Sequence, residues 1–127
     1  MDALQEREPF DRAAKEVLRR AQRGGEFKAM FTANAASDIF YLYSKARDIA
    51  AAKAALIFLI EAFGVVSVVR DDCSAALTSS IEDFEDALVT VCAEKEHVDY
   101  IITRDERFLQ ETSSVALVTP MDFLAII

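Results

Sequence analysis

The sequence contains few residues that break regular structure. Its 127 residues include three glycines, two prolines and no tryptophan. It shows no repeat, no low-complexity segment and no stretch with the composition of a linker. We therefore expect one domain over residues 1–127. Hydrophobic residues make up 53% of the chain, which is enough for a sizeable core.

Thiol and imidazole groups are scarce as well. Cys73 and Cys92 stand apart, without the spacing of metal ligands, and the simplest interpretation is a pair of reduced, buried thiols. His97 is the single histidine and follows charged residues at the end of a predicted helix. We expect it to cap that helix or to lie on the surface, because no serine or cysteine motif for nucleophilic catalysis accompanies it.

Long apolar runs are missing. The longest extends from Ile49 to Phe63, but Lys53 and Glu61 interrupt it and its period is helical. The N-terminal MDALQERE has neither the basic nor the apolar region of a signal peptide. We expect a cytoplasmic protein without a membrane partner.

An excess of positive charge is also absent, since the formal net charge is −8. A general nucleic-acid-coating protein needs a positive surface, so the charge argues against that class. Basic residues do recur at helical spacing on the first predicted helix, as Arg12, Lys15, Arg19 and Arg23. Two interpretations stay open: a solvated helix face on which Glu16 pairs with Arg20, or an edge that guides phosphate groups toward an acidic site.

The pattern of apolar residues predicts helices that alternate with short strands. Helices are predicted at residues 9–23, 48–63, 72–77, 84–92 and 106–110 and from Pro120 onward, and one more runs from a cap at Thr32 or Asn34 through Ala46. Strands are predicted at 27–31, 65–69, 100–103 and 115–118. The valine-rich run 65–69 is predicted to be a buried strand, and Ser79 or Ser80 to cap the following long helix with Glu82 or Asp83. This order favours an α/β fold of three layers, with helices on both faces of a mainly parallel sheet.

Acidic residues gather at the predicted helix starts and strand ends, where the site of a parallel sheet lies. The candidates are Asp38, Asp83, Asp86 and Asp105. Helix capping explains each of them alone, since the helix macrodipole favours acids in the first turn. If these acids instead converge on one crevice, they would bind Mg²⁺ or Mn²⁺, because a set of oxygen ligands without thiolates or imidazoles suits these ions. Such an ion would activate a water for in-line displacement at a phosphodiester.

Two stretches carry a resemblance to a known family. DFEDALVTVCAEKEHVDYIITRDERFL, followed by VALVTPMDFLAI, resembles the C-terminal half of a PIN domain, the nuclease fold of many bacterial toxins. FTANAASDIFYLYSK resembles the family's second strand and the helix that bears its second acid. The resemblance implies that the second, third and fourth family acids are Asp38, Asp86 and Asp105. Asp83 and Glu106 would assist as neighbours. Thr103 matches a family hydroxyl at this strand end, and the alternative is that it is an ordinary strand residue.

The resemblance also implies an activity. It implies an endoribonuclease that cleaves single-stranded RNA with Mg²⁺ or Mn²⁺, as the toxin of a pair with an antitoxin protein. One alternative is a PIN-like module that binds proteins without catalysis. A receiver domain of the response-regulator type is disfavoured, because the chain has no acidic pair after a first strand and no lysine after a late strand.

The start of the chain departs from the family pattern. PIN domains begin with a hydrophobic strand ending in Asp-Thr-Asn, whereas MDALQEREPF resembles the segment that comes after that strand. We therefore expect the first strand and its aspartate to be missing, with weak metal binding and little cleavage as the result. A rearrangement, a partner chain or a homodimer should fill the gap in the sheet. The carboxylates of Asp38, Asp86 and Asp105 are expected within roughly 10 Å of one another.

Overall fold

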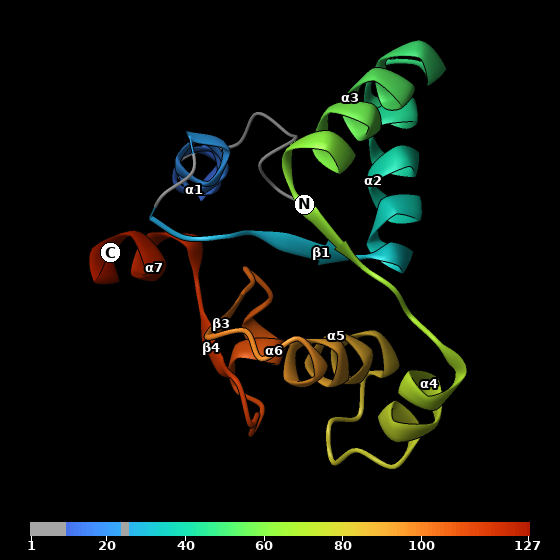
Figure 1. The fold of residues 1–127 in the computed structure, drawn as a ribbon, viewed down its shortest axis with the longest axis vertical. Coiled ribbons are helices and arrows are strands. Elements are labelled where there is room, and N and C mark those ends of the chain that lie inside the picture. The colour runs from blue at the N-terminus through green and yellow to red at the C-terminus, as the bar shows by residue number, and fades with distance from the viewer. Residues whose placement is uncertain (1–9, 24–25) are drawn as a thin grey trace. The chain divides into compact units, whose positions relative to one another are not determined.

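The computed structural model describes residues 10–23 and 26–127 (Figure 1). The predicted helix start at Pro9 and the predicted stop at Gly24 and Gly25 lie outside these residues. Helices alternate with short strands as the sequence predicts. The elements are α1 (Phe10–Arg23), β1 (Met30–Thr32), α2 (Ala33–Ala46), α3 (Ile49–Ala62), β2 (Gly64–Val66), α4 (Arg70–Leu77), α5 (Phe84–Lys95), β3 (Tyr100–Ile102), α6 (Glu106–Leu109), β4 (Ala116–Val118) and α7 (Pro120–Ile126).

The chain forms two compact units, Met1–Ser67 and Val68–Ile127. The first contains α1, α2 and α3 with β1 and β2, and the second contains the other helices with β3 and β4. A single domain over residues 1–127 stays a prediction. Among the described helices, none combines the length and the apolar character needed to cross a membrane.

Each unit contains a parallel pair of strands. Phe31 of β1 lies opposite Val65 of β2, and Ile101 of β3 lies opposite Leu117 of β4. The predicted parallel pairing is therefore confirmed. The prediction of one sheet containing 65–69, 100–103 and 115–118 is not met in the described part of the chain. Strands share a sheet only as hydrogen-bonded neighbours about 4.8 Å apart, and here β2 bonds only to β1 while β3 bonds only to β4.

The core of the first unit lies between α2 and α3. Ile39, Leu59 and Phe63 are buried there, and Leu18 of α1 and Phe31 pack against them. Asp48 begins α3 as predicted, since its Oδ1 accepts a hydrogen bond of 2.7 Å from the Ala51 N–H. This cap satisfies one of the unpaired donors at the helix start.

The prediction of a buried strand over residues 65–69 is wrong in two respects. The strand ends at Val66, and Val65 and Val69 are 43% and 51% exposed. Side chains alternate across a strand, so in this three-residue strand Val66 is buried while Val65 points away from the core. Valine composition alone does not distinguish a strand covered on both faces from one covered on one face.

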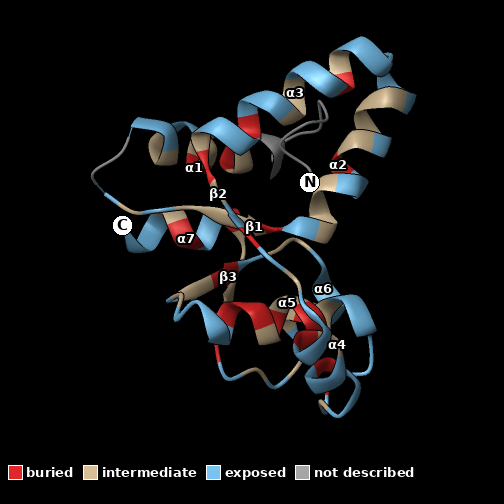
Figure 2. Ribbon diagram, turned by 45° about the vertical axis from the view of Figure 1, so that its right-hand side comes forward, coloured by how far each residue is buried: buried red, intermediate tan, exposed pale blue. Residues whose placement is uncertain are grey.

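The core of the second unit is built around α5, whose buried face packs on α4 and β3 (Figure 2). Its buried residues are Ala76, Ile81, Ala87, Leu88, Ala93, Ile101, Phe108 and Val115. Asp72 is buried beside this core, and its Oδ2 accepts hydrogen bonds from the Val69 N–H at 2.9 Å and the Lys95 Nζ at 2.7 Å. The lysine is the main reason that the pKa of Asp72 is lowered.

The start of α5 also differs from the prediction. Asp83 is the residue that caps the helix, and Ser79 instead accepts a turn hydrogen bond of 3.1 Å from the Ile81 N–H. Aspartate and serine are equally good N-cap residues. The helix therefore begins after Asp83, the last of the candidate capping residues.

Most of the smaller expectations agree with the structure. Cys92 is a buried free thiol as expected, whereas Cys73 packs against the core from its edge and is only partly buried. His97 lies just past α5 with a φ of 55°, and its N–H donates to the Glu94 carbonyl at 3.1 Å, so it terminates the helix as predicted. Glu16 accepts a hydrogen bond of 2.9 Å from Arg20, and Arg19 joins it. The pairing expected of a solvated helix face is therefore present on α1.

Candidate functional site

Asp86 is the third residue of α5. Its N–H donates to Asp83 Oδ1 at 3.0 Å, which fixes the first turn of the helix. Its carbonyl accepts a hydrogen bond of 2.9 Å from Thr90 Oγ1 one turn later. The neighbouring Ala87 is fully buried, so the Asp86 side chain stands at the edge of the core, partly shielded from water.

The surroundings of Asp86 oppose its negative charge. Its pKa is raised to about 6, first by burial and then by the charges of Asp83, Asp105 and Glu111, while Arg107 acts in the opposite direction. Acids from the start of α5, the end of β3 and the segment after α6 therefore act on one carboxyl group. The predicted site of Asp38, Asp83, Asp86 and Asp105 stays a prediction, and the interactions show only that the charges of Asp83 and Asp105 act on Asp86.

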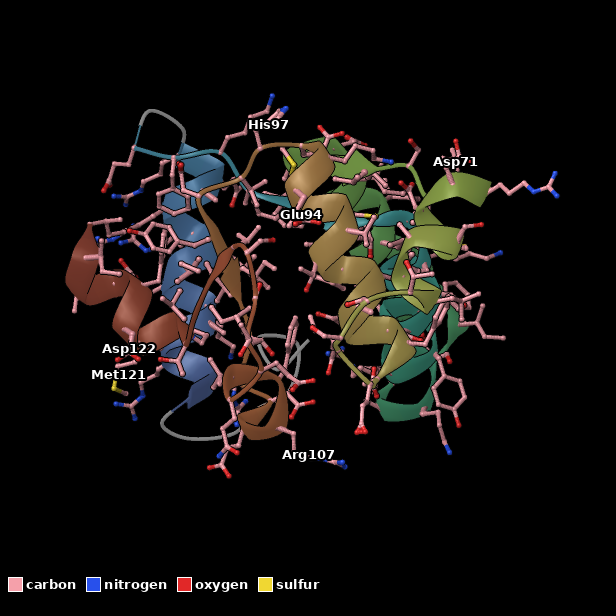
Figure 3. All side chains as sticks on the ribbon, turned by 90° about the horizontal axis from the view of Figure 1, so that it is seen from below. Asp71, Glu94, His97, Arg107, Met121 and Asp122 are labelled. Atoms are coloured by element: carbon pink, nitrogen blue, oxygen red, sulfur yellow. The ribbon has the colours of Figure 1, made fainter. Side chains whose placement is uncertain are left out.

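Asp105 follows β3 and is fixed by the backbone around it. Its Oδ1 accepts hydrogen bonds from the N–H groups of Arg107, at 2.9 Å, and Phe108, at 3.4 Å, so it caps α6. Its own N–H donates to Thr103 Oγ1 at 3.1 Å. Thr103 thus does more than an ordinary strand residue, because it orients the residue that bears the carboxylate. Arg107 extends outward from α6 beside this cap (Figure 3).

Sequence reasoning missed Glu111. Its N–H donates to the Phe108 carbonyl at 2.9 Å just past α6, and its charge contributes to the raised pKa of Asp86. No local signal in the sequence marks it, because it lies past the end of α6 and helical spacing does not relate it to Arg107. Glu106, expected to assist the site, is exposed at the first position of α6.

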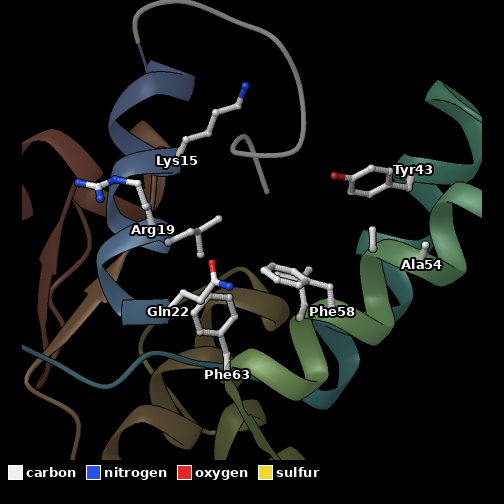
Figure 4. A pocket seen from close by; sticks show the side chains of 10 residues that line it. Lys15, Arg19, Gln22, Tyr43, Ala54, Phe58 and Phe63 are labelled. Carbon is white, nitrogen blue, oxygen red and sulfur yellow. The ribbon is translucent and has the colours of Figure 1, made fainter. Parts of the chain in front are cut away.

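Asp38 belongs to the first unit. It is exposed on α2, in the second turn rather than at the cap, and Thr32 stands at the N-cap position. The expected approach of its carboxylate to those of Asp86 and Asp105 stays a prediction. The predicted basic stripe lies in the same unit, where Lys15 and Arg19 line a pocket of about 450 Å³ with apolar side chains such as Phe58 and Phe63 (Figure 4).

The acids around Asp86 are the right type of ligand for a divalent metal, but their side chains are not arranged as a complete set of ligands. Carboxylate oxygens are the donors that Mg²⁺ and Mn²⁺ prefer. A cation would also relieve the repulsion that raises the pKa of Asp86. Within residues 10–23 and 26–127, however, no three acid, histidine or cysteine side chains converge closely enough to form a ligand set. Asp83 and Asp105 each use Oδ1 as a helix cap, which leaves Oδ2 as the oxygen for an ion.

Comparison with known proteins identifies the family. Neither a curated protein nor a solved structure matches this sequence. The PIN domain family model matches residues 1–107, a range that contains Asp38, Asp86 and Asp105. The α/β order of the elements agrees with that match. The chain therefore belongs to the PIN domain family.

Proposed function

We propose that this chain is a metal-dependent endoribonuclease acting on single-stranded RNA. PIN domains are generally nucleases, and the family match covers most of the chain. Asp86 and Asp105 are the proposed principal metal ligands, with Asp38 as a third and Asp83 as a neighbour. We also propose the three-layer α/β/α arrangement that the family resemblance implies.

The observation that carries the proposal is the raised pKa of Asp86. Acids at helix starts ordinarily have their charge favoured by the macrodipole. Here burial and three neighbouring carboxylates outweigh that effect and raise the pKa to about 6. Surroundings that oppose the charge of the Asp86 carboxyl group lower the stability of the fold. Perturbed pKa values of this kind are common at functional sites. Bound Mg²⁺ or Mn²⁺ would supply the missing positive charge, and would activate water and stabilise the charge of a displacement at phosphorus.

The residues around the acids have separable tasks. Thr103 and the N-terminus of α6 orient Asp105, and Asp83 holds the first turn of α5 in which Asp86 stands. Arg107 is a cation whose charge acts on Asp86, so we assign to it the attraction of an RNA phosphate toward the acids.

Metal binding tests the site directly. Mn²⁺ added to the protein should broaden the NMR signals of residues 83–86 and 105–111 first, since paramagnetic broadening is strongest near the ion. Asp86→Asn and Asp105→Asn should each weaken the effect, because an amide keeps the shape but loses the charge. Asp122→Asn is the matched control, as Asp122 is also the third residue of a helix, with its N–H bonded to Thr119 Oγ1 at 3.0 Å. Equal broadening in all variants would contradict the assigned ligands.

RNA cleavage tests the activity. We expect slow cleavage of a single-stranded RNA that needs Mn²⁺ or Mg²⁺ and is lost in Asp86→Asn, in Asp105→Asn and, if the third ligand is correct, in Asp38→Asn. A chain extended ahead of Met1 by a strand that ends in Asp-Thr-Asn, as the family pattern suggests, should cleave faster, because it carries a fourth acid. If the extended protein is inert on varied RNAs with both ions, the nuclease proposal fails.

The family resemblance extends the proposal to a cellular role. We propose a cytoplasmic toxin that an antitoxin protein neutralises. Induced expression should then arrest growth, and Asp86→Asn should remove the arrest while the protein still accumulates. Arrest by both forms would point to the alternative, a PIN-like module that acts by binding proteins. That alternative is favoured by the apolar residues exposed on α3.

A further inference from the structure

The first unit contains a pocket of about 450 Å³ that α1, α2 and α3 line (Figure 4). Pockets that bind small molecules in proteins commonly have volumes of about 300–1,000 Å³. Such pockets are mostly apolar and hold a few polar groups that orient the ligand. The described residues that line this pocket include none of the proposed metal ligands, so it is distinct from the acidic site.

The floor of the pocket is apolar and partly aromatic. Leu59 and Phe63 are buried there, and Leu18 of α1 packs against them. Phe58 lines the same space and is 48% exposed, so part of its ring is open to a ligand. An aromatic ring that entered the pocket would remove its own surface and that of Phe58 from water together. The floor therefore favours a ligand with a flat apolar body.

The rim of the pocket is polar. The Lys15 ammonium extends over the space from α1, and the Tyr43 hydroxyl points into it from α2 (Figure 4). Gln22 adds an amide from α1. Arg19 also lines the pocket, but its Nε donates to Glu16 at 2.9 Å and its guanidinium group points away from the space (Figure 4). Among the described lining residues, Lys15 is therefore the cation that faces a ligand.

We propose that this pocket binds a small aromatic carboxylate, a molecule with one negative charge attached to a flat apolar ring. The carboxylate lies between the Lys15 ammonium and the Tyr43 hydroxyl, since both groups donate hydrogen bonds and the first also carries the opposite charge. The ring lies against Phe58 and Phe63 in an offset or edge-to-face arrangement.

The composition of the pocket favours this ligand over a nucleotide, which also combines a flat ring with an anion. A phosphate monoester carries close to two negative charges at neutral pH, and one lysine balances only one of them. A nucleobase would place polar edge atoms against Leu59 and Phe63, where they would lose their hydrogen bonds to water without replacement. A carboxylate has a single charge, and its ring has no polar atom to satisfy.

NMR titration of the full chain with cinnamate tests the site. Amide signals of residues 15–22 and 54–63 should shift, with a dissociation constant on the order of 100 µM for a ligand of this size. Cinnamyl alcohol has the same ring without the charge and should bind about fivefold more weakly, because it cannot pair with the lysine. Adenosine monophosphate should bind more weakly than cinnamate.

Three variants locate the ligand within the pocket. Lys15→Gln should weaken the binding of cinnamate about fivefold and leave that of cinnamyl alcohol unchanged. Lys53→Gln is the matched control, because it removes an exposed lysine of the same unit that is outside the described lining of the pocket, and it should change neither affinity. Ala54→Leu narrows the pocket at an exposed position without lowering helix propensity, and it should weaken both ligands.

Several results would overturn the proposal. They are the absence of shifts up to about 5 mM cinnamate, shifts confined to the second unit, equal affinity for the alcohol, and tighter binding of adenosine monophosphate. An equal loss of cinnamate affinity in Lys15→Gln and Lys53→Gln would overturn it as well, since the lysine would then act only through net charge. If Ala54→Leu fails to fold, the comparison of these two lysine variants still decides the question.

Discussion

Asp86→Asn should make the protein more stable at neutral pH. The pKa of Asp86 rises from its ordinary value of 3.8 to about 6, and each pKa unit corresponds to about 1.4 kcal/mol. The full shift would give about 3 kcal/mol, but the macrodipole of α5 and solvent screening of a partly exposed side chain reduce it. We expect the variant to gain about 1–2 kcal/mol in the free energy of unfolding at pH 7.

The gain should depend on pH in a definite direction. Because the folded-state pKa is raised, the protonated carboxyl group stabilises the fold below its ordinary pKa, and this contribution disappears as pH rises through about 6. The amide in the variant does not titrate, so the variant and the native protein should converge near pH 4 and separate by pH 7. Urea unfolding at both pH values measures the difference, and carbon NMR of the Asp86 carboxyl group gives its pKa directly.

The matched control is again Asp122→Asn, which changes an exposed acid at the same helical position in α7. It should not reproduce the gain that Asp86→Asn shows at pH 7, because the Asp122 side chain is exposed. Two results would refute the reasoning: an Asp86 carboxyl group that titrates at its ordinary value, or a stability difference in Asp86→Asn that is the same at both pH values.

Two further predictions concern the second unit. Lys95→Met should lower the unfolding free energy, because it removes the cation that pairs with the Asp72 carboxylate. The loss should shrink as acid protonates Asp72, and Lys53→Met, at an exposed position, should cost little. His97→Gly should raise the melting temperature, with a gain of about 1 kcal/mol, since glycine adopts the φ of 55° without strain. His97→Ala should give no such gain, and a gain in both would show that strain is not the cause.

The elements with strong local signals are predictable from the sequence. Asp48 before an alanine-rich run and Thr119-Pro120 before an apolar run locate the starts of α3 and α7, because capping residues and proline act through the adjacent backbone. Parallel pairing also follows from the alternation of helices and strands. These features depend on a few neighbouring residues, so one sequence is enough to identify them.

The features that depend on packing are not predictable in the same way. Val65 and Val66 have the same side chain, yet only Val66 is buried, and nothing local distinguishes them. Glu111 is far from Asp86 in the sequence, and its charge acts on that carboxyl group only through the tertiary fold. Asp86 and Asp105 were grouped with Asp38 in one predicted site because family resemblance supplies long-range information that local pattern lacks, and this grouping stays a prediction.

The cap on α6 has a consequence for recognition. Two backbone N–H groups bind Oδ1 of Asp105, and Thr103 binds its N–H, so this side chain has already lost its rotational freedom in the folded protein. A free aspartate would lose that entropy only on meeting its ligand, at a cost of about 0.5–1 kcal/mol. Any ligand of the carboxylate therefore meets a group whose direction is set in advance. Selectivity among ligands at this position should arise from their size and coordination geometry, because turning the Asp105 side chain would break the cap of α6.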